Sequence, residues 1–186
     1  MKLDMHFYGD PVLRAPAERV AVVTEELRAF AADMVETMRA EQGVGLAAPQ
    51  VGRSVALCVV ELPEEYDVDE AGNRFNPGVE MPMILFNPVV VESSAKVDSH
   101  EEGCLSFPGM RGNIDRPIEI VLRFWDERGV EREARFVDFL ARVIQHEVDH
   151  LNGVLFIDRM SAAKRFALSG KLKKLKRETE ERLGLV

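Results

Sequence analysis

Several features that mark other protein classes are scarce or missing in this chain of 186 residues. It has only two cysteines, Cys58 and Cys104, which are too few for the disulfide framework of a small secreted domain. No apolar run approaches the roughly 20 residues that span a membrane, and the first residues form neither a signal-peptide core nor a transit segment. No phosphate-loop motif, repeat or low-complexity tract occurs. We therefore expect a single domain over residues 1–186 in the reducing cytoplasm, with no membrane or DNA partner.

Charge is unevenly distributed along a chain of ordinary composition, 46% hydrophobic and 30% charged. Residues 161–186 carry a net charge of +5, whereas the rest of the chain carries −13 of the total −8. The spacing of apolar residues predicts a helix from Ser161 to Leu183, and its basic residues from Lys164 to Arg177 are interrupted by no acid. Such a run is usually a solvated helix face, and a polyanionic partner is the sharper alternative.

Hydrophobic periodicity predicts a mixture of helices and strands. An amphipathic helix should begin after Thr24 and stop at Gly43, and a hairpin should turn at residues 127–129. Strands are expected at 55–61, at 83–91 with a bulge at Asn87-Pro88, at 118–126, at 130–137 and at 154–157, and residues 62–80 should form a long exposed loop. Several antiparallel strands around one core helix indicate an α+β domain.

The strongest chemical signal is His146-Glu147-Val148-Asp149-His150. Histidines four residues apart lie one helical turn apart, so both rings can bind one metal ion while the glutamate between them stays free to take a proton from water. Asp138 is a suitable N-cap for this helix, which contains no Gly or Pro before Asn152. Core histidines bonded to backbone carbonyls are the plain structural alternative.

A catalytic site of this kind needs a third protein ligand and an open position. A metzincin pattern fails because Phe156 stands where a third histidine belongs, and the first downstream glutamate, Glu178, lies inside the basic tail. No local pattern supports His6 or His100. Cys104 is the best candidate, because polar and glycine neighbours flank it and a thiolate with two imidazoles is a good ligand set.

A second unusual segment is Gly43-Val44-Gly45-Leu46-Ala47-Ala48-Pro49-Gln50. Glycines at alternate positions let another backbone or a ligand approach closely, although a tight turn between helix and strand explains them equally well. If the segment lines a site, Gln50 is its only strongly hydrogen-bonding side chain.

Taken in order, residues 43–50, Glu102-Gly103-Cys104-Leu105-Ser106 and Gln145–His150 resemble the three signature motifs of peptide deformylases. The resemblance implies an α+β fold in which antiparallel β-structure wraps the H-E-x-x-H helix and a C-terminal helix follows. It implies hydrolysis of the N-formyl group from the formyl-methionine of nascent polypeptides, with release of formate. It also implies Fe²⁺ in the cell, replaceable by Ni²⁺, Co²⁺ or Zn²⁺, where the ligand set alone would favour zinc. The basic C-terminal helix is similar to that of bacterial members, in which it helps dock the enzyme on ribosomal RNA at the exit site.

The resemblance also assigns site residues. It agrees with Cys104, His146 and His150 as metal ligands and with Glu147 as the proton carrier. It implies that the Gln50 amide and the Leu105 N–H bind the developing oxyanion. For the substrate it implies main-chain pairing with Gly43, Val44 and Gly45, a methionine pocket walled by Val44, Phe139 and Val143, and nearby roles for Glu102, Gly103 and Arg111 that the sequence cannot separate.

Two other interpretations remain open at this stage. One is a metallopeptidase that uses H-E-x-x-H on internal peptide bonds, and the other is a binding module stapled by a metal. His100 and Arg142 stand where the family often has apolar pocket residues, which leaves the shape of the pocket open.

Overall fold

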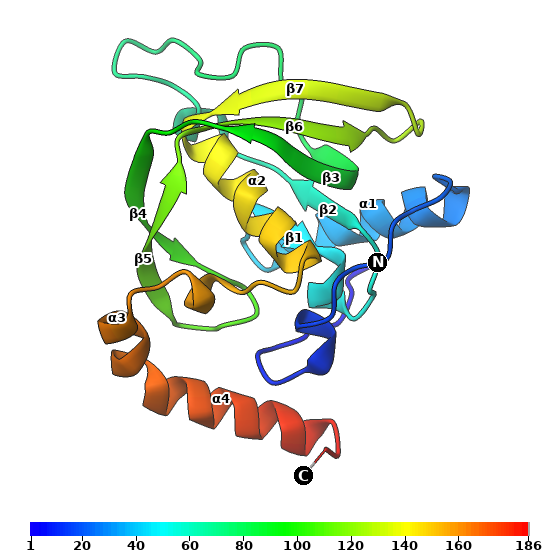
Figure 1. Ribbon diagram of the computed structural model, residues 1–186. Coiled ribbons are helices and arrows are strands. Elements are labelled where there is room, and N and C mark those ends of the chain that lie inside the picture. The colour runs from blue at the N-terminus through cyan, green and yellow to red at the C-terminus, as the bar shows by residue number, and fades with distance from the viewer. Residues whose placement is uncertain (186) are drawn as a thin grey trace.

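Two antiparallel sheets enclose the helix that carries the paired histidines, as the computed structural model, which describes residues 1–185, shows (Figure 1). The larger sheet has the order β1-β2-β3-β6-β7 and the smaller one pairs β4 with β5. The strands are β1 Gly45–Ala47, β2 Leu57–Val60, β3 Met83–Ser93, β4 Val97–Gly103, β5 Arg111–Pro117, β6 Glu119–Trp125 and β7 Glu131–Val137. The helices are α1 Glu25–Ala40, α2 Asp138–Leu151, α3 Ala162–Ala167 and α4 Ser169–Arg182. The expected α+β class with a central H-E-x-x-H helix is confirmed.

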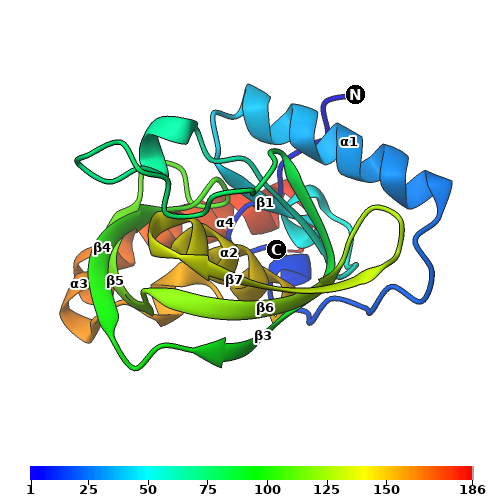
Figure 2. The same cartoon turned by 90° about the horizontal axis from the view of Figure 1, so that it is seen from above.

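The larger sheet is covered by a helix on each face. Along β2 the buried side chains alternate, so that Cys58 and Val60 pack against α2 whereas Leu57 and Val59 pack against α1. A strand covered on both faces reads as a continuous apolar run, because both sets of alternating side chains are buried. Seen from above, α1 lies on the far side of the strands from α2 (Figure 2).

The C-terminal helices pack against the body through a third apolar cluster. Leu168 and Leu172 are buried in it together with Phe107 and Phe156. The basic tail forms two helices, α3 and α4, which meet at Leu168, rather than the one continuous helix expected. Among residues 1–185, no helix is both long and apolar enough to cross a membrane.

The start of α2 differs from the expectation. Val137 is the N-cap, and Asp138 is the first helical residue with a φ of +57°. Its N–H still donates to the Ile118 carbonyl (2.7 Å), so the chain passes from strand to helix within one residue. That step requires a left-handed conformation, which aspartate tolerates better than most residues. The Asp138 carboxylate accepts from the Phe139 N–H at 2.8 Å instead of capping later amides.

Two further elements were predicted wrongly or missed. Residues 154–157 form no strand, because the short 3₁₀ helix Phe156–Asp158 occupies this segment. The β4-β5 pair was not expected, because its inward positions include the charged residues Glu102 and Arg116 rather than an apolar alternation. The hairpin of β6 and β7 and the irregular pairing of β3 at Asn87-Pro88 are confirmed.

The 62–80 loop is exposed over much of its length, as expected, but buried polar side chains anchor it. Asp67 is only 3% exposed and accepts hydrogen bonds from Arg74 and Asn76. The Asn76 amide also bonds both the N–H and the carbonyl of Val137, immediately before α2. The loop is thus tied to the start of the histidine helix.

Candidate metal centre

Three side chains from distant parts of the chain meet at one point. Cys104 follows β4, and His146 and His150 lie on successive turns of α2. One ligand atom from each lies within 4.8 Å of the other two, and the Cys104 Sγ is 3.3 Å from the His150 Nε2. A thiolate and two imidazoles form a donor set that suits Zn²⁺, Fe²⁺, Co²⁺ and Ni²⁺, so these residues fit a divalent transition metal.

The ring of His146 is oriented by a buried carboxylate. Glu102 is 7% exposed, and its Oε2 lies 2.9 Å from the His146 Nδ1, which leaves the Nε2 of that ring for a metal. Burial alone would raise the pKa of Glu102, but hydrogen bonds from His146 and Arg116 outweigh it and hold that pKa well below its usual range. Glu102 therefore stays anionic, and it can fix the histidine tautomer as carboxylates behind metal ligands usually do.

The same carboxylate is the centre of a buried ionic network. Arg116 is 2% exposed and binds Glu102 through two nitrogens at 2.6 and 2.9 Å, while its third nitrogen lies 2.8 Å from Asp149. Arg142 donates to Glu102 at 2.8 Å, and Arg159 binds Asp149 at 2.5 Å. The network joins β4, β5, α2 and the segment before α3, so it sets where the histidines stand relative to Cys104.

Glu147, beside His146 on α2, has no hydrogen-bond partner for one of its oxygens among the described residues. It is 4% exposed, and its Oε2 is one of two fully buried side-chain atoms of the described residues that have no hydrogen-bond partner, the other being the His150 Nδ1. Burial raises the pKa of Glu147 to about 7, despite the opposing influence of His146. A carboxyl group with that pKa can both accept and return a proton near neutral pH.

Gly45 is required where β1 passes this carboxylate. A Cβ on Gly45 would lie 2.3 Å from the Glu147 Oε1, closer than any real contact allows. Gly43 is similarly crowded, since its Cβ would lie 2.8 Å from the Leu105 Cδ1. The two glycines thus let the β1 segment approach both Glu147 and the residue after Cys104.

Gln50 is held in a fixed orientation next to the cysteine. Its Oε1 accepts from the Ala47 N–H at 2.9 Å, which turns the Nε2 toward the Ser106 Oγ (3.2 Å) and the Cys104 Sγ (3.5 Å). The amide donor that the sequence singled out therefore reaches the same point as the three candidate ligands.

The remaining predicted residues divide into those in or beside the apolar core and those toward the surface. Val143 is buried, and Val44 and Phe139 pack at the border of the same apolar cluster. Gly103 is the last residue of β4 and pairs with Arg111, whose side chain is 69% exposed. The structure thus separates Glu102, which lies behind His146, from Arg111, which lies at the surface.

Sequence reasoning missed Arg116, Ser106 and Asp149 as parts of this arrangement. The sequence gave only a weak indication that Arg116 is buried: it shares the inward face of β5 with Gly112 and Ile114, and of these only Ile114 is a large apolar residue. Asp149 lies inside the H-E-x-x-H motif, and the motif does not indicate that this acid pairs with arginines.

The two cysteines also differ as expected, since Cys58 is fully buried and burial raises its thiol pKa well above the usual value.

An α+β fold that presents H-E-x-x-H on its central helix, beside a cysteine just after β4, is typical of a metal-dependent hydrolase. Comparisons with known proteins agree. Residues 3–166 match the family model for polypeptide deformylase. The peptide deformylase of Opitutus terrae is 44% identical over 96% of this chain and 95% of its own, and that of Synechococcus sp. strain CC9605 is 45% identical over 86% of this chain and 74% of its own.

Solved structures give the same result. A plant peptide deformylase, PDF1B, superimposes with a TM-score of 0.85 at 35% identity, over 98% of this chain and 93% of its own. The Synechococcus elongatus peptide deformylase, solved in complex with actinonin, gives a TM-score of 0.79 at 39% identity, over 93% and 85% of the two chains. The chain belongs to the peptide deformylase family. It is a metal-dependent hydrolase that removes the N-formyl group from nascent polypeptides, and the metallopeptidase and binding-module interpretations are set aside.

Proposed function

We propose that Cys104, His146 and His150 hold the metal ion of this deformylase and that the ion is Fe²⁺, with Ni²⁺, Co²⁺ or Zn²⁺ as substitutes. The observation that supports the ligand set is the approach of the three donor atoms to within 4.8 Å of one another. Beside them lies the buried Glu147, whose Oε2 has no hydrogen-bond partner among the described residues. When bound, an ion in such a site acidifies water and polarises a carbonyl oxygen.

The side chains around the ligands have separate tasks in this proposal. Glu147 takes a proton from the attacking water and delivers it to the nitrogen of the departing peptide, which its pKa of about 7 permits. The Gln50 Nε2 and the Leu105 N–H donate to the oxygen of the formyl group as negative charge develops on it. Gln50 needs little reorganisation for this task, because the Ala47 N–H already holds the other end of its amide.

The substrate backbone pairs with the segment Gly43–Gly45 as an added strand, and the methionine side chain enters between Val44, Phe139 and Val143. β1 is an edge strand, since it pairs only with β2 among the described strands, so its other edge can accept a peptide. Gly103 precedes Cys104 and pairs with Arg111, and in this proposal both residues contact the peptide, Arg111 through its exposed side chain.

Replacing Cys104 by serine should remove most of the bound metal. A serine hydroxyl is a poorer ligand than a thiolate for these ions, so we expect affinity to fall by about 10-fold or more. The measurement is metal content per chain, by elemental analysis of anaerobically purified protein. Cys58→Ala is the matched control and should retain a full complement, because Cys58 lies in the apolar core. Equal metal content in both variants would contradict the assignment of Cys104 as a ligand.

We also propose that the basic tail binds ribosomal RNA at the exit site of nascent chains, in the cytoplasm, and that residues 1–186 act as one domain. Its support is the exposed lysines of α4 on a chain whose remainder is strongly acidic. Three basic residues of α4 lie 3.5–3.8 Å from glutamates four residues further along the helix: Lys174, Lys176 and Arg177. Lys171 and Lys173, in the first turns of α4, are therefore the basic residues we choose for the test.

The double variant K171E/K173E should bind ribosomes more weakly yet deformylate a short peptide at the normal rate. Reversing two charges removes phosphate contacts, so we expect weaker binding and a shallower dependence of affinity on salt. The control K96E/R128E makes the same change of charge in the turns β3-β4 and β6-β7. Sedimentation with ribosomes at several salt concentrations measures the affinity and its salt dependence. Equal affinity of the two variants would show that the tail is an ordinary solvated helix face.

A further inference from the structure

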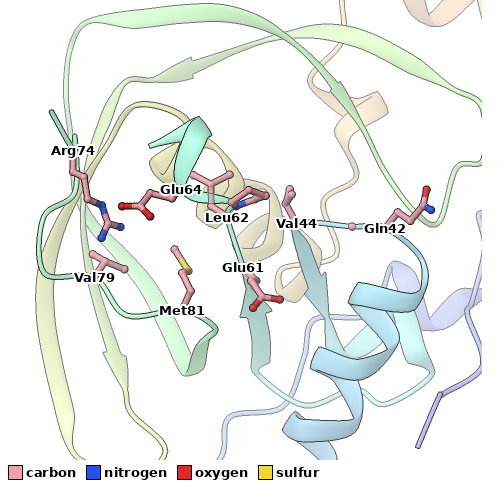
Figure 3. A pocket seen from close by; sticks show the side chains of 10 residues that line it. Gln42, Val44, Glu61, Leu62, Glu64, Arg74, Val79 and Met81 are labelled. Carbon is pink, nitrogen blue, oxygen red and sulfur yellow. The ribbon is translucent and has the colours of Figure 1, made fainter. Parts of the chain in front are cut away.

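Phe166, on α3, is 81% exposed, more than any other large apolar side chain among residues 1–185. By contrast, Val44 and Met81 are partly buried and line a groove of about 560 Å³ between the start of β1 and the 62–80 loop (Figure 3). No residue of α3 is buried in the described structure. A single exposed apolar residue is common on protein surfaces, and Phe166 becomes informative through the residues around it.

The short helix α3 holds this ring in a defined place at the periphery of the molecule (Figures 1 and 2). Met160 before the helix and Leu168 after it are both buried in the third apolar cluster. The Ser161 hydroxyl caps the helix by accepting from the Lys164 N–H at 3.2 Å. A side chain on an anchored backbone loses less entropy when it binds a partner than one on a loose segment does.

The neighbours of Phe166 along the helix are small. Side chains in a helix lean toward the residues three and four positions earlier, and here those residues are Ala163 and Ala162. On the other side lies Gly170, where an added Cβ would meet no atom within 4 Å. The ring is therefore covered on neither side by a large side chain of its own segment, and a flat partner can approach it.

Basic side chains flank the ring on both sides. Lys164 and Arg165 directly precede Phe166, Lys171 follows it by five residues, and all three are exposed. Among residues 1–185 none of these three forms an ion pair, unlike the basic residues further along α4 that pair with glutamates. Unpaired cations beside an open aromatic ring are typical of sites for single-stranded nucleic acid, in which the cations bind phosphates and the ring stacks on a base.

A lipid surface fits the same segment less well, because a helix that lies on a membrane needs an apolar stripe facing outward. Here Leu168 and Leu172 are buried against the body, so one ring alone remains outside. We propose that Phe166 stacks on an unpaired base of RNA while the basic residues beside it bind the adjoining phosphates. This proposal rests on the proposed binding of the tail to ribosomal RNA, and it directs the tail to single-stranded rather than paired RNA.

The test measures binding of the full chain to a single-stranded oligouridylate and to the same sugar-phosphate backbone without bases. The wild type should bind the oligouridylate about 5- to 30-fold more tightly, as stacking of one base on an aromatic ring implies. Phe166→Ala should bind both ligands equally, with an unchanged dependence of affinity on salt, because no phosphate contact is lost. Phe166→Trp should keep the preference, and so should the matched control Phe75→Ala, which removes an exposed ring from the 62–80 loop.

Four results would overturn the inference. They are equal binding of the two ligands by the wild type, a preference that survives Phe166→Ala, full retention of the preference by Phe166→Leu, and a loss of binding by Phe166→Ala to phosphatidylglycerol vesicles but not to oligouridylate. The third result would indicate a purely apolar contact, and the fourth a lipid surface. Circular dichroism of each variant checks that the fold is intact, as we expect because α3 buries none of its side chains.

Sedimentation with ribosomes separates failure of this inference from failure of the proposed function. If the tail does not bind ribosomal RNA, K171E/K173E will sediment as the wild type does. If only the stacking is wrong, K171E/K173E will bind weakly while Phe166→Ala binds normally. If both proposals hold, both variants will bind weakly, and only K171E/K173E will change the dependence on salt.

Discussion

Replacing Glu147 by glutamine should lower kcat by about 10²- to 10⁴-fold while metal and fold are retained. The amide has the shape of the carboxylate but cannot take up and return a proton. The buried Oε2 has no hydrogen-bond partner among residues 1–185, so the substitution there breaks no hydrogen bond that holds the structure. Because the proton moves only during the reaction, KM for a formyl-Met peptide should change little.

Formate release under anaerobic conditions, with metal analysis of the same sample, measures this effect. Glu133→Gln is the matched control, since Glu133 is half-exposed and pairs with Arg123 on the surface of the larger sheet. It should have wild-type turnover. If Glu147→Gln kept full activity with metal bound, another group would have to carry the proton.

Replacing Glu102 by alanine should cause the largest loss of stability of any single change considered, about 3–5 kcal/mol. Arg116 is 2% exposed and Arg142 is 5% exposed, and both would lose their ion pair with Glu102, which leaves Arg116 with Asp149 as its carboxylate partner. His146 would lose the acceptor that orients its ring, so metal affinity should fall by about 10- to 100-fold in addition.

Urea unfolding and metal titration of the variant test both parts. Glu101→Ala changes the preceding residue, whose carboxylate is 55% exposed and lies 3.7 Å from the Arg111 guanidinium. That surface pair should contribute no more than about 1 kcal/mol. Similar losses in the two variants would show that the buried network is not what holds β4 against α2.

The candidate metal ligands could be named from the sequence because they depend on local features of the chain. Histidines four residues apart share a helix face whatever surrounds them, and Cys104 stood out from Cys58 by its polar neighbours. The alternating glycines at 43 and 45 predicted a close approach, which the structure shows against Leu105 and Glu147.

The pieces that could not be predicted depend on segments far apart in the chain. β4 and β5 escaped detection because charged side chains occupy inward positions that a hydrophobic pattern reads as solvent. The left-handed Asp138 follows from the bond of its N–H to Ile118. The assignment of residues 154–157 to a strand failed because Leu155, Phe156 and Ile157 pack in the apolar cluster that also holds residues of α4.

By itself, the amino-acid sequence determined the class of fold through its periodicity, the residues proposed as metal ligands through short motifs, and the reaction through its resemblance to peptide deformylases. The tertiary structure alone decided that Arg116 and Arg142 neutralise Glu102 behind His146, and that the 62–80 loop closes a groove beside Val44. The physical reason is that a buried charge requires a partner and a groove requires two walls, and in both cases the folded chain brings the second element from a distant part of the sequence.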